Sequence, residues 1–217
     1  YENCLVGIVT VDDAMYVLQD EVTEDIQIMA GVSPNEESYF GTSVFQHAKN
    51  RIFWLLFLML SATVSGVLLA HYEDAMAVMP VLTTFIPMLM GVGGNSGSQS
   101  STLIIRGLAV GEVEMKDILR VIFKEVRIGL VVGTLLAVVN GIRVWLMYGH
   151  NLLLCLALGI TIIAIVCIAK SIGCTLPLIA KRLGMDPAIM AAPLISTILD
   201  TCSLLVYFRV VTLFFHL

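Results

Sequence analysis

A carboxylate in the middle of an apolar run is the residue with the clearest chemical potential in this sequence. Asp200 lies within residues 187–208, a run long and apolar enough to cross a bilayer. Ser196, Thr197 and Ser203 share its helical face, at i−4, i−3 and i+3. A charged group inside a membrane costs about 2.5–3.5 kcal/mol on insertion scales, so such a group usually faces a cavity or an ion path. The spacing predicts an oxygen-lined stripe on an otherwise apolar helix.

Pro193 precedes Asp200 by seven residues and is expected to interrupt the hydrogen bonding of the same helix. We expect this to free a carbonyl near Ile189, which would add an oxygen to the stripe. The alternative is a protonated Asp200 that hydrogen-bonds to a neighbouring helix.

A second polar segment reads FIPMLMGVGGNSGSQSSTLIIRG, from Phe85 to Gly107. Its four glycines and its amide and hydroxyl side chains would lack hydrogen-bond partners in lipid. Small residues permit close helix packing, and polar side chains suit a water-filled path. With Asp200 as a partner, the two segments are interpreted as opposite walls of one path, with the glycines packing and Asn95 to Thr102 facing the ion's water.

The composition, 58% apolar and 13% charged, is typical of an all-α integral membrane protein. We expect five spans, at about residues 51–70, 79–105, 128–145, 152–169 with a continuation towards Pro177, and 187–208 or beyond. Residues 111–126 could form an interfacial helix. Lys170 is expected to extend to the cytoplasmic interface, and the alternative is that it pairs with a carboxylate. If the five spans alternate, one side holds Lys49, Arg51, Arg106, Lys116, Arg120, Lys124, Arg127, Lys181 and Arg182. The positive-inside rule then places the N-terminus in the cytoplasm and the C-terminus outside.

The first 48 residues carry acidic side chains and no Lys or Arg, which argues against a nucleic-acid partner and favours cations. Residues 5–9 are a strand candidate, and Thr10 with Asp13 is typical of a helix start. Gly31 would end that helix. The pairs Asp20/Glu24 and Glu21/Asp25 repel one another at i,i+4 spacing. Either solvent and salt screen them, or a divalent cation bridges them to a neighbouring domain.

The sequence does not favour an enzyme. An intramembrane aspartyl protease needs two carboxylates that share a proton, and Asp200 is the one carboxylate that we place well inside the spans. No G-x-S-x-G elbow is present, and the cysteines lack zinc-site spacing. Hydroxyl, amide, carbonyl and carboxylate oxygens instead suit Mg²⁺, Ca²⁺, Mn²⁺ or Na⁺. A two-fold dimer would bring two Asp200 carboxylates to one hydrated ion.

The motifs GVGGNSGSQSSTLIIRGLA and MDPAIMAAPLISTILDTCSLLVYF resemble the MgtE family of Mg²⁺ channels and transporters. The leader LVGIVTVDDAMYVLQDEVTEDIQIMAGV resembles the end of that family's CBS domain pair and its connecting plug helix. The resemblance implies a CBS end at 1–11, a cytoplasmic plug helix and linker at 12–50, and a five-helix pore domain at 51–217. It further implies a homodimer in the plasma membrane that takes up hydrated Mg²⁺ and is gated by cytosolic Mg²⁺.

The resemblance also implies roles for individual residues. Asp200 matches the family's pore aspartate, and the matching pore-lining positions are Gly91, Gly94, Asn95 and Thr102. We add Ser196 from the stripe, and Ser98, which stands where other members have Asn. Ala192 likewise precedes Pro193 where others have Asn, so the preference for Mg²⁺ over Mn²⁺, Co²⁺ or Ca²⁺ stays open. The matching regulatory Mg²⁺ positions are Asp13, Glu21, Glu24 and Asp25.

Two other functions fit the same sequence. One is an exchanger that couples Mg²⁺ movement to Na⁺ or H⁺. The other is a membrane scaffold or sensor without transport, in which the glycines form only a dry dimer seam.

Overall fold

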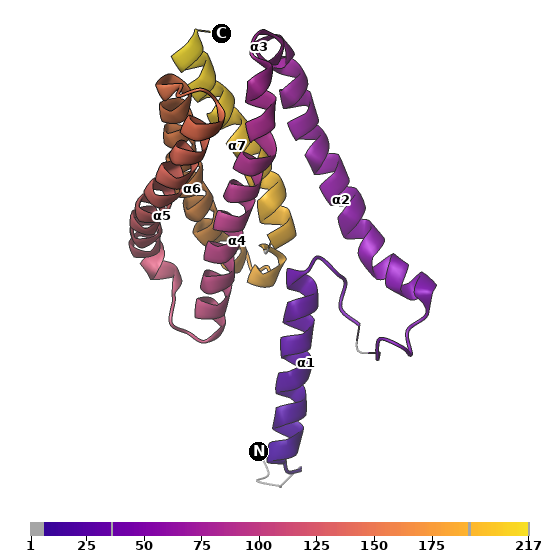
Figure 1. The fold of residues 1–217 in the computed structure, drawn as a ribbon. Helices are drawn as coiled ribbons and strands as arrows, with labels where there is room; N and C mark the ends of the chain where they lie inside the picture. The colour runs from indigo at the N-terminus through magenta and orange to yellow at the C-terminus, as the bar shows by residue number, and fades with distance from the viewer. Residues whose placement is uncertain (1–6, 36, 191, 217) are drawn as a thin grey trace.

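The computed structural model describes residues 7–35, 37–190 and 192–216, and within these ranges it contains helices and no strand (Figure 1). The α-helices are α1 (Val11–Met29), α2 (Val44–His71), α3 (Glu73–Val78), α4 (Ile86–Ala109), α5 (Ile118–Met147), α6 (Leu152–Arg182) and α7 (Ala192–Phe215). Three short 3₁₀ helices join them: η1 (Pro80–Phe85), η2 (Met115–Asp117) and η3 (Pro187–Met190). The predicted all-α class is confirmed.

Helices α4 to α7 form a bundle, and α2 packs on α7 but runs obliquely away from it toward its own N-terminal end (Figure 1). Among the residues that the structure describes, four segments are long and apolar enough to cross a membrane: Val44–His71, Met115–Met147, Leu152–Arg182 and Pro187–Phe215. Helix α4 is more polar, yet it lies inside the bundle against α6 and α7. Its 24 residues correspond to about 36 Å at ~1.5 Å per residue. The span predicted at 79–105 therefore stays a prediction, and α4 is the helix that would form it.

Helix α5 differs from the sequence-based expectation. Instead of an interfacial helix over 111–126 and a span from 128, the structure has one helix from Ile118 to Met147, preceded only by η2. No proline interrupts residues 118–147, and the side chain of Glu125 is buried rather than exposed to solvent. The separate interfacial helix was wrong.

Helix α1 begins as predicted, at a capping box. The Thr10 amide donates to Asp13 Oδ2 at 2.9 Å, and the Asp13 amide donates to Thr10 Oγ1 at 3.2 Å. Gly31 follows the helix with φ +69°, the left-handed conformation expected after a C-cap. Residues 7–9 are not a strand, and the rest of the predicted 5–9 strand lies outside the described residues. The domain boundaries at 11 and 50 stay predictions.

Helix α7 starts later than the span predicted at 187–208. Asp186 Oδ1 accepts a hydrogen bond from the Ala188 amide at 2.8 Å, but the turn that it caps is η3 and not α7. Helix α7 begins at Ala192, so Pro193 lies in its first turn, where no helical hydrogen bond is lost. Pro193 therefore does not interrupt α7 as predicted, and the free carbonyl near Ile189 stays a prediction.

Glycines set the closest approaches between helices in the bundle. A Cβ on Gly173 of α6 would collide with the carbonyl oxygen of Gly97 on α4, so the two backbones touch at this crossing. On α5, a Cβ at Gly129 would lie 3.1 Å from Cys167 Cα, and one at Gly133 would lie 3.0 Å from Ile163 Cα. These contacts fix how α4 and α5 are rotated against α6.

Gly173→Ala should destabilise the bundle because its methyl group meets backbone that cannot move as a flexible side chain can. Overpacking of this kind costs about 1–3 kcal/mol. Thermal unfolding of the purified protein in detergent measures the loss. Gly141→Ala on α5 is the matched control, since nothing lies within 4 Å of its Cβ position. Equal melting temperatures for the two variants would contradict the Gly97–Gly173 contact.

Candidate functional site

One face of α4 carries a row of small and polar residues. Gly91, Asn95, Ser98 and Thr102 follow one another at spacings of four, three and four, which places them on one side of the helix. Asn95 and Thr102 are exposed in the single chain. A groove of about 660 Å³ is lined by Asn95, Ser98, Gln99, Thr102 and Leu103. We call this face the polar row of α4.

The side of α4 next to the polar row packs against α7. A Cβ on Gly93 would collide with Ser203 Oγ, and one on Gly94 would lie 3.3 Å from Ser196 Oγ. A Cβ on Gly97 would collide with the Leu199 side chain. Gly94 and Ser196, both predicted to line a path, thus meet at the contact between the two helices, and Gly94 is buried there.

Asp200 is half-buried and lies between two contacts of α7. On one side Ser196 and Ser203 face α4, as described above. On the other side Thr201 Oγ1 and Ser65 Oγ of α2 are 2.8 Å apart. No hydrogen bond or ion pair joins the Asp200 carboxylate to any other residue that the structure describes.

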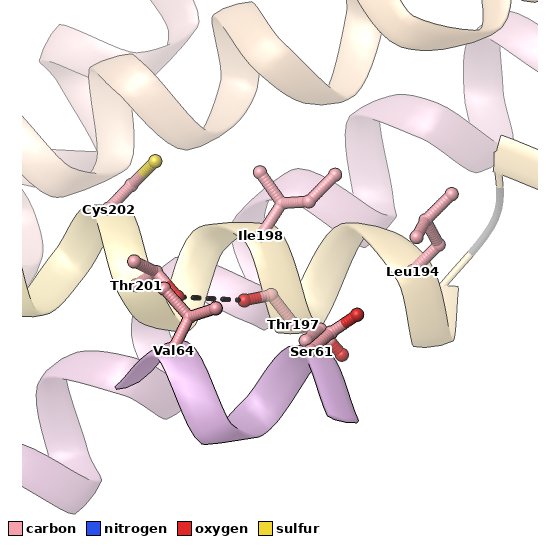
Figure 2. Close-up of a pocket in the computed structure, with 7 residues that line it drawn as sticks. All are labelled: Ser61, Val64, Leu194, Thr197, Ile198, Thr201 and Cys202. Carbon is pink, nitrogen blue, oxygen red and sulfur yellow. Dashed lines mark hydrogen bonds between the residues drawn. The ribbon is translucent and has the colours of Figure 1, made fainter. Parts of the chain in front are cut away.

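Figure 2 shows the α2 side of this region. Val64 and Ser61 of α2 face Thr197 and Thr201 of α7 across a cavity of about 300 Å³. Thr201 Oγ1 donates to the Thr197 carbonyl oxygen at 3.5 Å, and Thr197 Oγ1 donates to the Pro193 carbonyl oxygen at 3.0 Å. These hydroxyls are satisfied within α7, so the cavity is mainly apolar, in contrast to the polar row.

Two buried hydroxyls near this region lack partners within the described ranges. They are Ser98 Oγ on the polar row and Ser203 Oγ at the α4–α7 contact. A buried hydroxyl without a partner loses free energy unless water or a ligand meets it. Ser98 is the predicted path-lining position with the least support from the sequence, and its hydroxyl keeps unused hydrogen-bonding capacity.

The sequence reasoning missed a second buried carboxylate. Glu125 of α5 is 7% exposed, and its Oε2 accepts a 2.6 Å hydrogen bond from Ser100 Oγ of α4. Lys170 of α6 is 5% exposed, with its Nζ 3.8 Å from Glu125 Oε2 and 3.4 Å from Ser100 Oγ. The expectation that Lys170 extends to the interface was wrong, and Glu125 is a carboxylate inside the bundle that the predicted spans did not include.

A signal for this cluster was present in the sequence. Glu125, Gly129 and Gly133 recur at i, i+4 and i+8, so Glu125 continues the glycine face of α5 that packs on α6. Lys170 precedes Gly173, which marks the close crossing of α6 with α4. A charged residue in register with packing glycines lies toward the bundle and not toward solvent.

The four predicted regulatory residues are not gathered in one place. Asp13 accepts hydrogen bonds from Thr10 in the capping box, which lowers its pKa. Glu24 lines a surface hollow of about 420 Å³, while Asp25 lines a separate cavity of about 170 Å³. Within the described ranges, no three His, Cys, Asp or Glu side chains are grouped to hold a metal ion.

Asp25 faces the end of the bundle across its cavity, where Asp186 and Lys181 also lie. Partial burial raises the pKa of Asp25, and the negative charges of Asp186 and Glu21 raise it further. A raised carboxyl pKa means that ionisation opposes this contact, so the contact weakens as pH rises through that pKa. The acidic end of α1 thus meets the bundle against electrostatic repulsion.

The glycine-rich α4 and the Asp200 helix fall within one region of similarity to known proteins. A family described as "MgtE: Divalent cation transporter" matches residues 86–210, which is more than half of the chain. The chain belongs to the MgtE family. The match covers α4 to most of α7 and so includes both the polar row and Asp200.

Three relatives are each named "Magnesium transporter MgtE". The one from Thermus thermophilus is 39% identical over 98% of this chain, and that from Bacillus subtilis is 36% identical over 99%. The one from Enterococcus faecalis is 33% identical over 99%. This chain spans 47%, 47% and 46% of their lengths, respectively. Family membership together with the apolar helices makes the chain an integral membrane protein.

Asp25→Asn should strengthen the contact of α1 with the end of the bundle in buffer free of divalent cations, because it removes the repulsion from Asp186. Amide hydrogen exchange across the C-terminal half of α1 should slow several-fold. Asp20→Asn, on the same helix but outside this cavity, is the control. Equal exchange rates in the two variants would contradict the role given to Asp186.

Proposed function

We propose that this chain forms the membrane domain of a Mg²⁺ uptake channel in the plasma membrane. The observation that carries the proposal is the Asp200 carboxylate, which has no partner within the described ranges although it lies inside an apolar helix next to α4. An unpaired carboxylate at such a position is unfavourable in lipid and favourable beside a cation. The relatives' name as magnesium transporters agrees with this ion.

A second copy of the chain would complete the path. The polar row leaves the Asn95 amide and the Thr102 hydroxyl exposed on one side of a helix that lies among apolar ones. Lipid cannot hydrogen-bond to these groups, so protein or water must cover them. A two-fold homodimer with both polar rows at its axis would enclose water and bring two Asp200 carboxylates together.

The groups along this path suit a hydrated ion. Mg²⁺ gives up its water reluctantly and is often held through one or two carboxylates while it keeps several waters. In the proposed dimer Asp200 supplies the charge, and Asn95, Ser98 and Thr102 would hydrogen-bond to the ion's water. These oxygen ligands would also accept Mn²⁺, Co²⁺ or Ca²⁺, which leaves selectivity to the width of the path.

Gating by cytosolic Mg²⁺ is proposed at the α1 end of the bundle. Helix α1 approaches the bundle at the end where α4 and α6 finish, and Lys181 Nζ of α6 donates to the Leu108 carbonyl oxygen there at 3.4 Å (Figure 1). The basic residues at this end favour the cytoplasmic side. A divalent cation between Asp25 and Asp186 would convert their repulsion into attraction and hold α1 against the bundle, with Glu21, Glu24 and Asp13 as further acidic positions on the helix.

Asp200→Asn should remove saturable Mg²⁺ flux in reconstituted vesicles, because the amide keeps the shape of the side chain but not its charge. A loss of at least about tenfold is expected, equivalent to ~1.4 kcal/mol of ion stabilisation. Flux is measured with a Mg²⁺-sensitive dye inside the vesicles. Asp74→Asn, an exposed carboxylate of α3, should leave flux unchanged. Wild-type flux in Asp200→Asn would contradict the path.

Thr102→Cys, placed in a cysteine-free background, should cross-link two chains through a short bifunctional thiol reagent, because the polar rows face each other in the proposed dimer. Val138→Cys is the control, since it is exposed on α5 and lies away from the polar row. The cross-linked dimer is read on a denaturing gel. Equal cross-linking at both positions would contradict the proposed axis.

A further inference from the structure

The buried cluster of Glu125, Ser100 and Lys170 has no part in the proposed path, and its chemistry is unusual for a membrane bundle. Each residue comes from a different helix, and the three are 7%, 1% and 5% exposed. Of the ion pairs among the described residues, Lys170–Glu125 is the one inside the bundle, since Lys116–Glu114 is at the surface. A buried carboxylate without a counter-charge costs free energy. The question is therefore what role the Lys170 ammonium has beside Glu125.

The cluster lies behind the polar row. Ser100 follows Gly97, which meets Gly173, and Lys170 precedes Gly173 by one turn. Ser100 falls on the α6-facing side of α4, roughly opposite Thr102 and Ser98 by helical register. The cluster is therefore separated from the path by the thickness of one helix, and an ion in the path does not contact it.

The oxygen atoms around the Lys170 ammonium are of the kinds that would bind a free monovalent cation as ligands. Glu125 Oε2 lies 3.8 Å from Nζ and Ser100 Oγ lies 3.4 Å from it. Carboxylate and hydroxyl oxygens are hard ligands that bind alkali cations through charge and dipole. Both distances exceed an ideal charge-assisted hydrogen bond of about 2.7–2.9 Å, so the ammonium lies beside the carboxylate without binding it tightly.

We infer that the Lys170 ammonium is a tethered replacement for a free monovalent cation at Glu125. It follows that this carboxylate is not a counter-ion site, and that ion movement is not coupled to Na⁺ through it. The inference rests on the proposed function, because it concerns what drives the proposed Mg²⁺ flux. An exchanger needs a site that the counter-ion enters and leaves, whereas a cation fixed to the chain cannot leave.

The same cluster could instead be only a packing contact, and the two roles differ in their response to cations. If Lys170 replaces a cation, its removal creates a vacant place that Na⁺ or K⁺ can fill. If the cluster only packs, removal leaves a buried carboxylate that protons alone neutralise. Cation-dependent stability of a Lys170 variant therefore separates the roles.

The test compares purified Lys170→Met with the wild type and with Glu125→Gln/Lys170→Met, by thermal unfolding in the same detergent. Lys170→Met should melt roughly 3 °C higher in saturating NaCl or KCl than in N-methylglucamine chloride at equal ionic strength and pH. The wild type and the double variant should show no such difference. A Lys170→Met protein that responds to pH but to neither cation would overturn the inference.

A second measurement needs no variant and tests the consequence of the inference for transport, which is that Mg²⁺ entry is not coupled to Na⁺. Vesicles that hold wild-type protein and radioactive sodium should retain the sodium while external Mg²⁺ enters. Sodium loss in proportion to Mg²⁺ entry would overturn the inference and leave Mg²⁺ transport intact. Absence of Mg²⁺ entry would instead overturn the proposed function.

Discussion

The structure depends on one constraint, which is that hydrocarbon offers no hydrogen bonds to polar groups. Helix α4 carries more polar side chains than its neighbours. It satisfies the constraint because different sides of the helix face different partners. Gly93, Gly94 and Gly97 turn toward α7 and α6. Ser100 binds the Glu125 carboxylate, and Asn95 and Thr102 remain on the outside. The proposed channel follows from this last group, since only protein or water can satisfy it.

The two buried carboxylates illustrate how the same constraint has two solutions. Glu125 is compensated within the chain by Lys170 and Ser100, and so it stabilises the arrangement of three helices. Asp200 has no such partner among the described residues and lies at the edge of the contact between α7 and α4. In our account the first fixes the path's wall and the second is left for the ion.

Sequence spacing predicted the features that are determined locally. The Thr10 capping box, the long α6 helix and the common face of Asp200 with Ser196 all follow from short-range periodicity. The positions of Glu125 and Lys170 depend on which faces of α5 and α6 meet, which hydropathy alone does not encode. Pro193 was misplaced for a similar reason, because a one-turn shift of a helix start changes a proline from a disruptive residue into a tolerated one.

The central claim is that α4 and Asp200 form a path through which Mg²⁺ moves along its own electrochemical gradient. Mg²⁺ entry into vesicles under an imposed potassium diffusion potential tests it most directly, with Na⁺ absent and pH equal on both sides. The account predicts entry that grows as the interior becomes more negative and reverses at the equilibrium potential of Mg²⁺. Entry that ignores voltage, or that requires a Na⁺ or proton gradient, would contradict it.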